Sequence, residues 1–172
     1  MTPEEFAVLY PIVLAWIQKT ISDHAVSAKT IGTRGFKRLP SYFSQELLDA
    51  TKVVLVPRVP TPPLSSIGLQ RFKDFERADF SGITYIDTIF LKRARATDEK
   101  LHFHELIHVV QWRLLGPERF LNLYADGLEK FGYWDSPLER MAYSAAAEFS
   151  RSKKTFDAQA LVLRELRELS AL

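Results

Sequence analysis

The segment LHFHELIHVVQW, residues 101–112, contains three of the four histidines of the chain. On an α-helix, His104 and His108 lie one turn apart and about 40° from each other, so both imidazoles can reach one metal ion. Glu105 lies about 100° from His104, which is too far round to join the pair but close enough to touch a metal-bound water. This HExxH pattern indicates two metal ligands and a general base for hydrolysis.

Two further polar side chains of this segment have other predicted roles. His102 lies about 160° from His104, in the sector of Arg113, and we interpret it as a structural or surface histidine. Gln111 lies about 20° from His104. We expect Gln111 to support the site from behind, by a hydrogen bond to a ligand carboxylate or to a backbone group.

The apolar residues of the segment indicate that the histidine helix is buried. They form an arc on the side opposite the histidine pair, made of Phe103, Leu106, Ile107, Val110 and Leu114. Two buried histidines beside a buried glutamate require partners, because polar groups are costly to bury alone. A metal ion would satisfy them, and the alternative is a hydrogen-bonded polar cluster in the core.

A catalytic zinc site needs a third protein ligand and an open position for water. The chain has no cysteine, and no histidine follows His108. Gln and Leu occupy positions 111 and 114, where the longer HExxHxxGxxH pattern requires Gly and His. The third ligand is therefore His24 or a downstream carboxylate. The acidic candidates are Glu118, Asp126, Glu129, Asp135, Glu139, Glu148 and later acids.

Glu139 is the preferred third ligand, with Asp135 and Glu148 as alternatives. It lies in the first turn of a helix predicted to begin at SPLE. Ala142 and Ala146 share its face, so this helix can approach another one closely. Ser136 and Glu139 also match the capping pattern S-x-x-E, which would explain Glu139 without a metal.

HELxHVVQ followed by PLExxAY, residues 137–143, resembles the zincin metallopeptidases, and among them the gluzincins. These carry HExxH on one helix and a glutamate ligand on a later helix, and the chain is similar to small bacterial domains of this type. The resemblance covers roughly residues 80–150. It implies that His104, His108 and Glu139 bind zinc and that Glu105 polarises the water.

The resemblance also implies a sheet edge where a peptide adds as a strand, and an oxyanion stabiliser. GITYIDTIFLK, residues 82–92, predicts the strand before the histidine helix. Its alternation would place Thr84, Ile86, Thr88 and Phe90 on one face, and Ile83, Tyr85, Asp87, Ile89 and Leu91 on the other. Larger gluzincins stabilise the oxyanion with a downstream His or Tyr.

Tyr143, one turn after Glu139, is the best candidate for the oxyanion role in this chain. Tyr133 and Arg140 are weaker ones. The alternative for Tyr143 is simple packing, with its hydroxyl satisfied nearby.

Composition sets wider limits. The 172 residues, 47% hydrophobic and 26% charged, favour a single domain. The net charge of +2 is spread without a basic block, which gives no indication of nucleic-acid binding. The apolar run 6–17 is too short for a membrane span and has an acidic flank unlike that of a signal peptide. We therefore expect a cytoplasmic protein without a membrane partner, and no particular oligomeric state is indicated.

The remaining pattern predicts a mostly helical α+β fold, zincin-like, with a small sheet whose edge strand precedes the histidine helix. Pro11 should bend the first helix, and Gly116 and Gly132 should end two later ones. The predicted helices are about 3–22, 44–50, 98–115, 117–131, 136–149 and 158–169, with strands at 52–56 and 82–92 and a proline-rich loop at 57–66. Within the single domain, residues 1–75 have no assigned role, 80–150 form the zincin-like core and 151–172 the C-terminal helix.

The expected function is a zinc-dependent hydrolase of peptide bonds, with one Zn²⁺ per chain and a peptide or protein as substrate. The alternative is a binding module of zincin fold that keeps the metal without turnover. The missing downstream histidine and the unmatched residues 1–75 favour that alternative. A metal-free structural protein is a third possibility.

Overall fold

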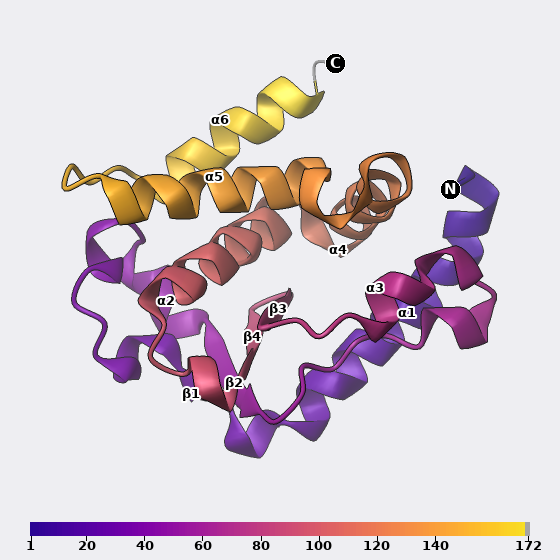
Figure 1. Ribbon diagram of the computed structural model, residues 1–172, viewed down its shortest axis with the longest axis horizontal. Helices are drawn as coiled ribbons and strands as arrows, with labels where there is room; N and C mark the ends of the chain where they lie inside the picture. Colours follow the sequence, from indigo (N-terminus) through magenta and orange to yellow (C-terminus); the bar gives the residue numbers. More distant parts are fainter. Residues whose placement is uncertain (171–172) are drawn as a thin grey trace.

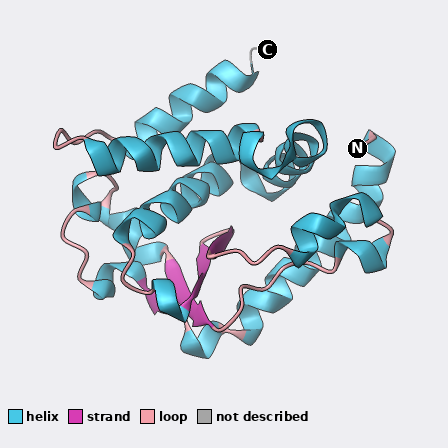
Figure 2. Cartoon of the chain, in the orientation of Figure 1, coloured by secondary structure: helices cyan, strands magenta, loops and turns pink. Residues whose placement is uncertain are grey.

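Figure 1 shows a computed structural model of the chain, which describes residues 1–170. The helices are α1 (Pro3–Asp23), α2 (Gln45–Ala50), α3 (Lys73–Arg77), α4 (Glu99–Asp135), α5 (Pro137–Arg151) and α6 (Ala158–Ser170). The strands are β1 (Lys29–Thr30), β2 (Lys52–Val56), β3 (Gly82–Tyr85) and β4 (Thr88–Lys92). Helices dominate and the sheet is small (Figure 2), so the predicted α+β class is confirmed.

The sheet is mixed, with the strand order β1-β2-β4-β3. β2 pairs with β4 in parallel, and the other two pairings are antiparallel. The prediction of one strand over residues 82–92 is wrong, because the segment folds back at Ile86 and Asp87 into the hairpin β3–β4. Ile86 has a φ of 59°, a left-handed conformation that β-branched residues rarely adopt, so the sequence carries no ordinary turn signal here.

The hairpin determines which of its two strands forms the edge of the sheet. β3 is the edge of the sheet, whereas β4 lies between β3 and β2. The predicted alternation of side chains across 82–92 fails at the turn, because residues before and after it belong to different strands.

The helices and the sheet pack on one another in layers through their apolar faces. In Figure 1 the sheet lies between α1 and α4, α5 packs over α4, and α6 lies beyond them. One continuous core joins these layers, and its buried members include Ile17 of α1, Phe90 of β4, Phe103 of α4, Phe149 of α5 and Val162 of α6.

The central helix α4 carries the HExxH pattern. Asp98 caps it by accepting a hydrogen bond from the backbone N–H of Leu101 at 2.9 Å. Every residue from 102 to 112 is buried, so the helix is enclosed on all sides there. Leu114 is 44% exposed, which corrects its predicted place in the buried arc, since the last turn before Gly116 leaves the core.

Two glycines interrupt α4, as the sequence predicts. Gly116 and Gly132 have φ values of 73° and 74°, with ψ of 165° and 179°. Side chains other than glycine rarely adopt this region. The chain therefore turns twice, and the intervening residues 117–131 return toward the site instead of continuing the axis of the first part (Figure 1).

The N-terminal part packs on the same body. Thr2 caps α1 by accepting from the backbone N–H of Glu5 at 3.1 Å. Leu9 of α1 joins Leu64, Leu69 and Phe72 in a second apolar cluster, which ties α1 to the segment that follows the proline-rich loop. Within residues 1–170, no helix combines the length and apolar character needed to cross a membrane.

Candidate metal centre

Three candidate metal ligands converge between α4 and α5. His104 and His108 come from one face of α4, and Glu139 comes from the first turn of α5. The three side chains are buried, with 5%, 4% and 2% of their surface exposed. The two helices approach closely because Ala142 and Ala146, on the facing side of α5, are also buried, as the sequence predicts.

The distances among the ligand atoms fit one metal ion. The Nε2 atoms of His104 and His108 are 3.2 Å apart. Glu139 places Oε2 3.4 Å from His104 Nε2 and Oε1 3.4 Å from His108 Nε2. Each oxygen of Glu139 thus faces one histidine, and one donor atom from each of the three residues lies within 4.8 Å of the others. Zinc bonds of about 2.0–2.2 Å separate tetrahedral ligands by roughly 3.3–3.6 Å, so small shifts of the side chains would close the site around one ion. Two imidazole nitrogens and a carboxylate are also a donor set that zinc favours.

Gln111 fixes the orientation of His108. Its side-chain amide donates to the backbone carbonyl of Leu138 at 3.0 Å. Its Oε1 therefore faces His108 and accepts from Nδ1–H at 2.8 Å. This bond leaves the Nε2 lone pair of His108 directed at the shared point between the ligands. Gln111 thus bonds a backbone group, as the sequence indicates, and it also supports the candidate ligand imidazole of His108.

The Glu139 carboxylate is oriented toward the histidines and not toward its own helix end. Tyr124 donates its hydroxyl to Oε1 at 2.7 Å. Ser136 occupies the N-cap position of α5 without a side-chain capping bond, so the alternative capping box is not formed. Oε2 of Glu139 is buried and has no hydrogen-bond partner among residues 1–170. A buried carboxylate oxygen without a hydrogen-bond partner is a group that a bound cation would satisfy.

The charges of this cluster are strongly coupled. Burial acts to lower the pKa of His108, but the Glu139 carboxylate outweighs it and raises this pKa to about 9. Burial acts to raise the pKa of Glu139, yet His108 and His104 hold it well below its usual range. The cluster is therefore built around a negative carboxylate and a positive charge beside it, the place that a metal cation would take.

Glu105 lies next to this cluster and contacts β3. Thr84 donates its hydroxyl to Glu105 Oε2 at 2.7 Å. A β-carbon added at Gly82 would lie 2.5 Å from Glu105 Oε1, so this close approach requires glycine. Burial raises the pKa of Glu105, although His104 and His108 oppose the rise. A raised pKa moves a carboxylate toward the range in which it exchanges protons near neutral pH.

Tyr143 is at the open side of the histidine pair. Its ring centroid lies 4.5 Å from that of His104, and 38% of its surface is exposed. Tyr133 and Tyr143 each pack against Trp134, with ring centroids 5.2 Å and 5.4 Å from its ring. Tyr143 is thus close to the candidate ligands, and Tyr133 is its neighbour across Trp134. Arg140 is exposed on the outer side of α5.

The other candidate ligands lie elsewhere. His24 packs against Phe90 on the α1 side of the sheet and pairs its Nδ1 with the carbonyl of Thr20. Asp135 and Glu148 are exposed, and Glu148 faces Arg151. His102 is completely buried and donates from Nδ1 to the carbonyl of Asp98 at 2.8 Å, which makes it a structural and not a surface histidine.

Three residues that contact the site are missing from the sequence-based set. They are Tyr124, Thr84 and Gly82. Thr84 and Gly82 reach Glu105 because the hairpin brings β3 beside α4. Tyr124 reaches Glu139 because the chain turns at Gly116. Gly82, directly before the β-branched residues of β3, was the one available signal, since a glycine in a strand often marks a close approach.

Two hollows meet at His104 and Glu105. One is an open groove of about 740 Å³ that passes Gly82, Lys100, Trp134 and Tyr143. The other is an apolar cavity of about 110 Å³ that extends from the site toward α1. His104 and Glu105 line both hollows, and His108 and Glu139 line the apolar cavity, so a small molecule can reach the candidate ligands despite their burial.

Comparisons with protein-family models, with curated proteins and with solved structures return no match for this chain. What the site can do therefore rests on its own geometry and chemistry.

Proposed function

We propose that the chain is a zinc-dependent hydrolase of peptide bonds. The observation that carries this proposal is the three-ligand cluster of His104, His108 and Glu139, with the Glu105 carboxylate beside it at the junction of the groove and the cavity. Three protein ligands, an adjacent carboxylate and access for a substrate are the parts that metal-assisted hydrolysis requires.

A bound zinc would lower the pKa of a water and polarise the substrate carbonyl. Glu105 accepts a proton from the attacking water as the new C–O bond forms. Glu105 then delivers this proton to the amide nitrogen as the C–N bond breaks, which releases an acid and an amine. Thr84 keeps the Glu105 carboxylate in place through its 2.7 Å bond. Tyr143 stands beside His104, where a phenol can donate to the developing oxyanion.

The edge strand β3 supports a peptide as the substrate. Ser81 accepts a backbone bond from Lys92, so alternate residues, Gly82 and Thr84, direct their backbone groups away from β4. Trp112 already donates its indole N–H to the carbonyl of Thr84 at 3.1 Å. The backbone groups of Gly82 and the N–H of Thr84 face the site and can pair with an extended peptide.

The first test is Glu105→Gln in the zinc-loaded protein. We expect the variant to keep one zinc per chain and to lose at least 100-fold in peptide turnover, because the amide cannot accept the proton. The matched control is Glu118→Gln, an exposed position on the same helix, which should leave both unchanged. Elemental analysis gives the zinc content, and cleavage of a peptide library followed by mass spectrometry gives the turnover.

The same measurements separate the alternatives. One zinc per chain without cleavage of any library peptide would replace the hydrolase with a metal-containing binding module. Absence of zinc after supplementation, with a His104→Ala variant that behaves as wild type, would leave a metal-free polar cluster. The cytoplasmic location belongs to the same proposal, and cell fractionation tests it.

A further inference from the structure

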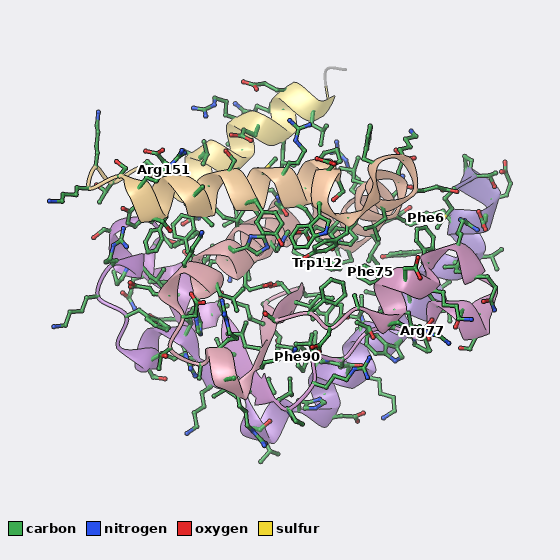
Figure 3. The ribbon with its side chains drawn as sticks, in the orientation of Figure 1. Phe6, Phe75, Arg77, Phe90, Trp112 and Arg151 are labelled. Carbon is green, nitrogen blue, oxygen red and sulfur yellow. The ribbon has the colours of Figure 1, made fainter. Side chains whose placement is uncertain are left out.

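Apolar side chains form most of the lining of the cavity beside the candidate ligand cluster. Phe6, Leu9 and Val13 contribute from α1, and Leu64, Phe72 and Phe75 from the segment that follows the proline-rich loop. Trp112, Leu121 and Leu128 of α4 form the opposite wall. Figure 3 labels one residue from each wall, Phe6, Phe75 and Trp112.

Besides the tyrosines Tyr10, Tyr85 and Tyr133, the polar side chains of the lining belong to the candidate site. They are His104, Glu105, His108 and Glu139, together with Thr84 and Tyr124. An apolar group inside the cavity would therefore hold the adjoining part of the same molecule against the ligand cluster and Glu105. A polar or charged group in the same place would lose its hydration without a partner.

The volume of the cavity limits the size of its occupant. It measures about 110 Å³. Apolar cavities of about 150 Å³ stay free of water and bind benzene. The cavity is thus suited to one branched aliphatic or single-ring aromatic side chain, and it is too small for a long acyl chain.

We propose that this cavity selects peptides with one large apolar side chain beside the bond that is cleaved. The assignment rests on the proposed hydrolase function and names its substrate class. The peptide backbone lies in the open groove along β3, and the apolar side chain enters between α1 and α4. Burying a leucine-sized side chain favours such substrates by roughly ten-fold or more over glycine.

The assignment also gives residues 1–75 a role. None of the four site residues comes from this part of the chain, but α1 and residues 62–75 supply one half of the cavity wall. The second apolar cluster, Leu9 with Leu64, Leu69 and Phe72, holds the two segments together, and its four members themselves line the cavity. The N-terminal part therefore acts as the specificity element of the site.

Binding of hydroxamates to the zinc-loaded protein tests this selection without requiring turnover. The probes are the hydroxamates of N-acetylglycine, N-acetylglutamate, N-acetyl-leucine and N-acetylphenylalanine, with dodecanoic hydroxamate as the long-chain probe. Each chelates zinc in the same way, so differences in affinity report the side chain. We expect the leucine and phenylalanine probes to bind at least 10-fold tighter than the glycine and glutamate probes, and tighter than the long-chain probe.

Two variants of α1 form a matched pair. Val13→Phe adds a ring to the cavity wall, whereas Val8→Phe makes the same change at a position that is 66% exposed on the same helix. We expect Val13→Phe to remove the 10-fold preference and Val8→Phe to keep it, with equal zinc content in both. Ala125→Leu, on the α4 wall, narrows the cavity by a smaller change and should reduce the preference if Val13→Phe does not fold.

The outcomes distinguish the two proposals. Equal affinity for the glycine and leucine probes, or the same preference in Val13→Phe and Ala125→Leu as in wild type, overturns the cavity assignment and leaves the hydrolase proposal intact. Tightest binding of the dodecanoic probe overturns the single side chain as occupant. No binding of any probe, or no zinc to bind it, overturns both proposals.

Discussion

The hydroxyl of Tyr124 holds the carboxylate of Glu139 in place. Tyr124 donates to Oε1 at 2.7 Å, and Oε2 faces His104 without a hydrogen-bond partner among residues 1–170. Together with the bond from Gln111 to His108, this contact fixes two of the three ligands before any metal binds. Such supporting contacts typically change metal affinity by 10–100-fold.

Tyr124→Phe removes only this hydroxyl. We expect zinc affinity to fall by about 10-fold, because Glu139 gains freedom to rotate away from the histidines. Competition with a chromophoric chelator measures the affinity. Tyr85→Phe is the control, since it loses a buried bond to the carbonyl of Pro60 but touches no ligand, and its zinc affinity should equal that of wild type. Equal affinities in all three proteins would remove Tyr124 from the site.

His102 gives the protein a pH dependence of its own. Burial lowers its pKa to about 4, from the ordinary value of 6.5. In the unfolded chain the imidazole takes up a proton as the pH falls below 6.5, while the folded protein stays unprotonated until about 4. The free energy of unfolding therefore decreases between these values, by about 3 kcal/mol, and the loss is complete below pH 4.

His102→Phe tests this origin. The variant keeps a ring against Phe36 but has no proton to gain. Urea unfolding at pH 7 and pH 4.5 should show a smaller loss of stability in the variant than in wild type. If acidification destabilises both proteins equally, the dependence comes from other groups.

At the scale of elements, the hairpin β3–β4 decides how the sheet meets α4. Its turn places Gly82 and Thr84 beside Glu105, and the absence of a side chain at residue 82 allows the contact. The edge strand therefore positions the proposed base as well as offering backbone groups to a peptide.

Gly82→Ala should displace Glu105, because the new side chain on β3 points at its carboxylate. The new β-carbon would lie 2.5 Å from Glu105 Oε1 and 2.6 Å from Leu91 Cδ2, so Glu105 or the strand must move. We expect a loss of about 1–3 kcal/mol in stability and a larger loss in turnover than in zinc content. Ser81→Ala, at the neighbouring position, provides the control. Turnover like that of wild type in Gly82→Ala would show that Glu105 does not need this contact.

The sequence predicts the parts of the site that depend on local periodicity. The spacing of His104 and His108 on a helix, the helix start before Glu139 and the two glycine breaks follow from residue type and a 3.6-residue turn. The hairpin is not predictable in this way, because isoleucine occupies its left-handed turn position. Tyr124 is also inaccessible to such reasoning, since its contact depends on how the chain turns at Gly116 and packs against α5.

At the scale of the molecule, the candidate ligand cluster joins α4 and α5, two helices that both contribute to the core. Zinc would bind the folded arrangement and not the unfolded chain, so it adds RT ln(1 + [Zn]/Kd) to the stability.

A chelator should therefore lower the melting temperature of the wild-type protein. With free zinc at 1,000 times the Kd, removal costs about 4 kcal/mol, which corresponds to roughly 8–16 °C for a chain of this size. Calorimetry with and without chelator measures the shift. Glu139→Ala, which lacks a ligand, should melt at the same temperature in both conditions. A chelator shift in this variant equal to that of wild type would place the metal elsewhere.

The parallel pairing of β2 with β4 determines which segment of the chain can change in length. Parallel neighbours cannot be joined by a tight turn, so the fold requires a long connection between Val56 and Thr88. Residues 62–75, which form part of the cavity wall, belong to that obligatory connection. Insertions or deletions there would resize the cavity while the ligands, Glu105 and the strand register stay as they are. Changes in loop length are thus a route by which this architecture can acquire a different substrate preference.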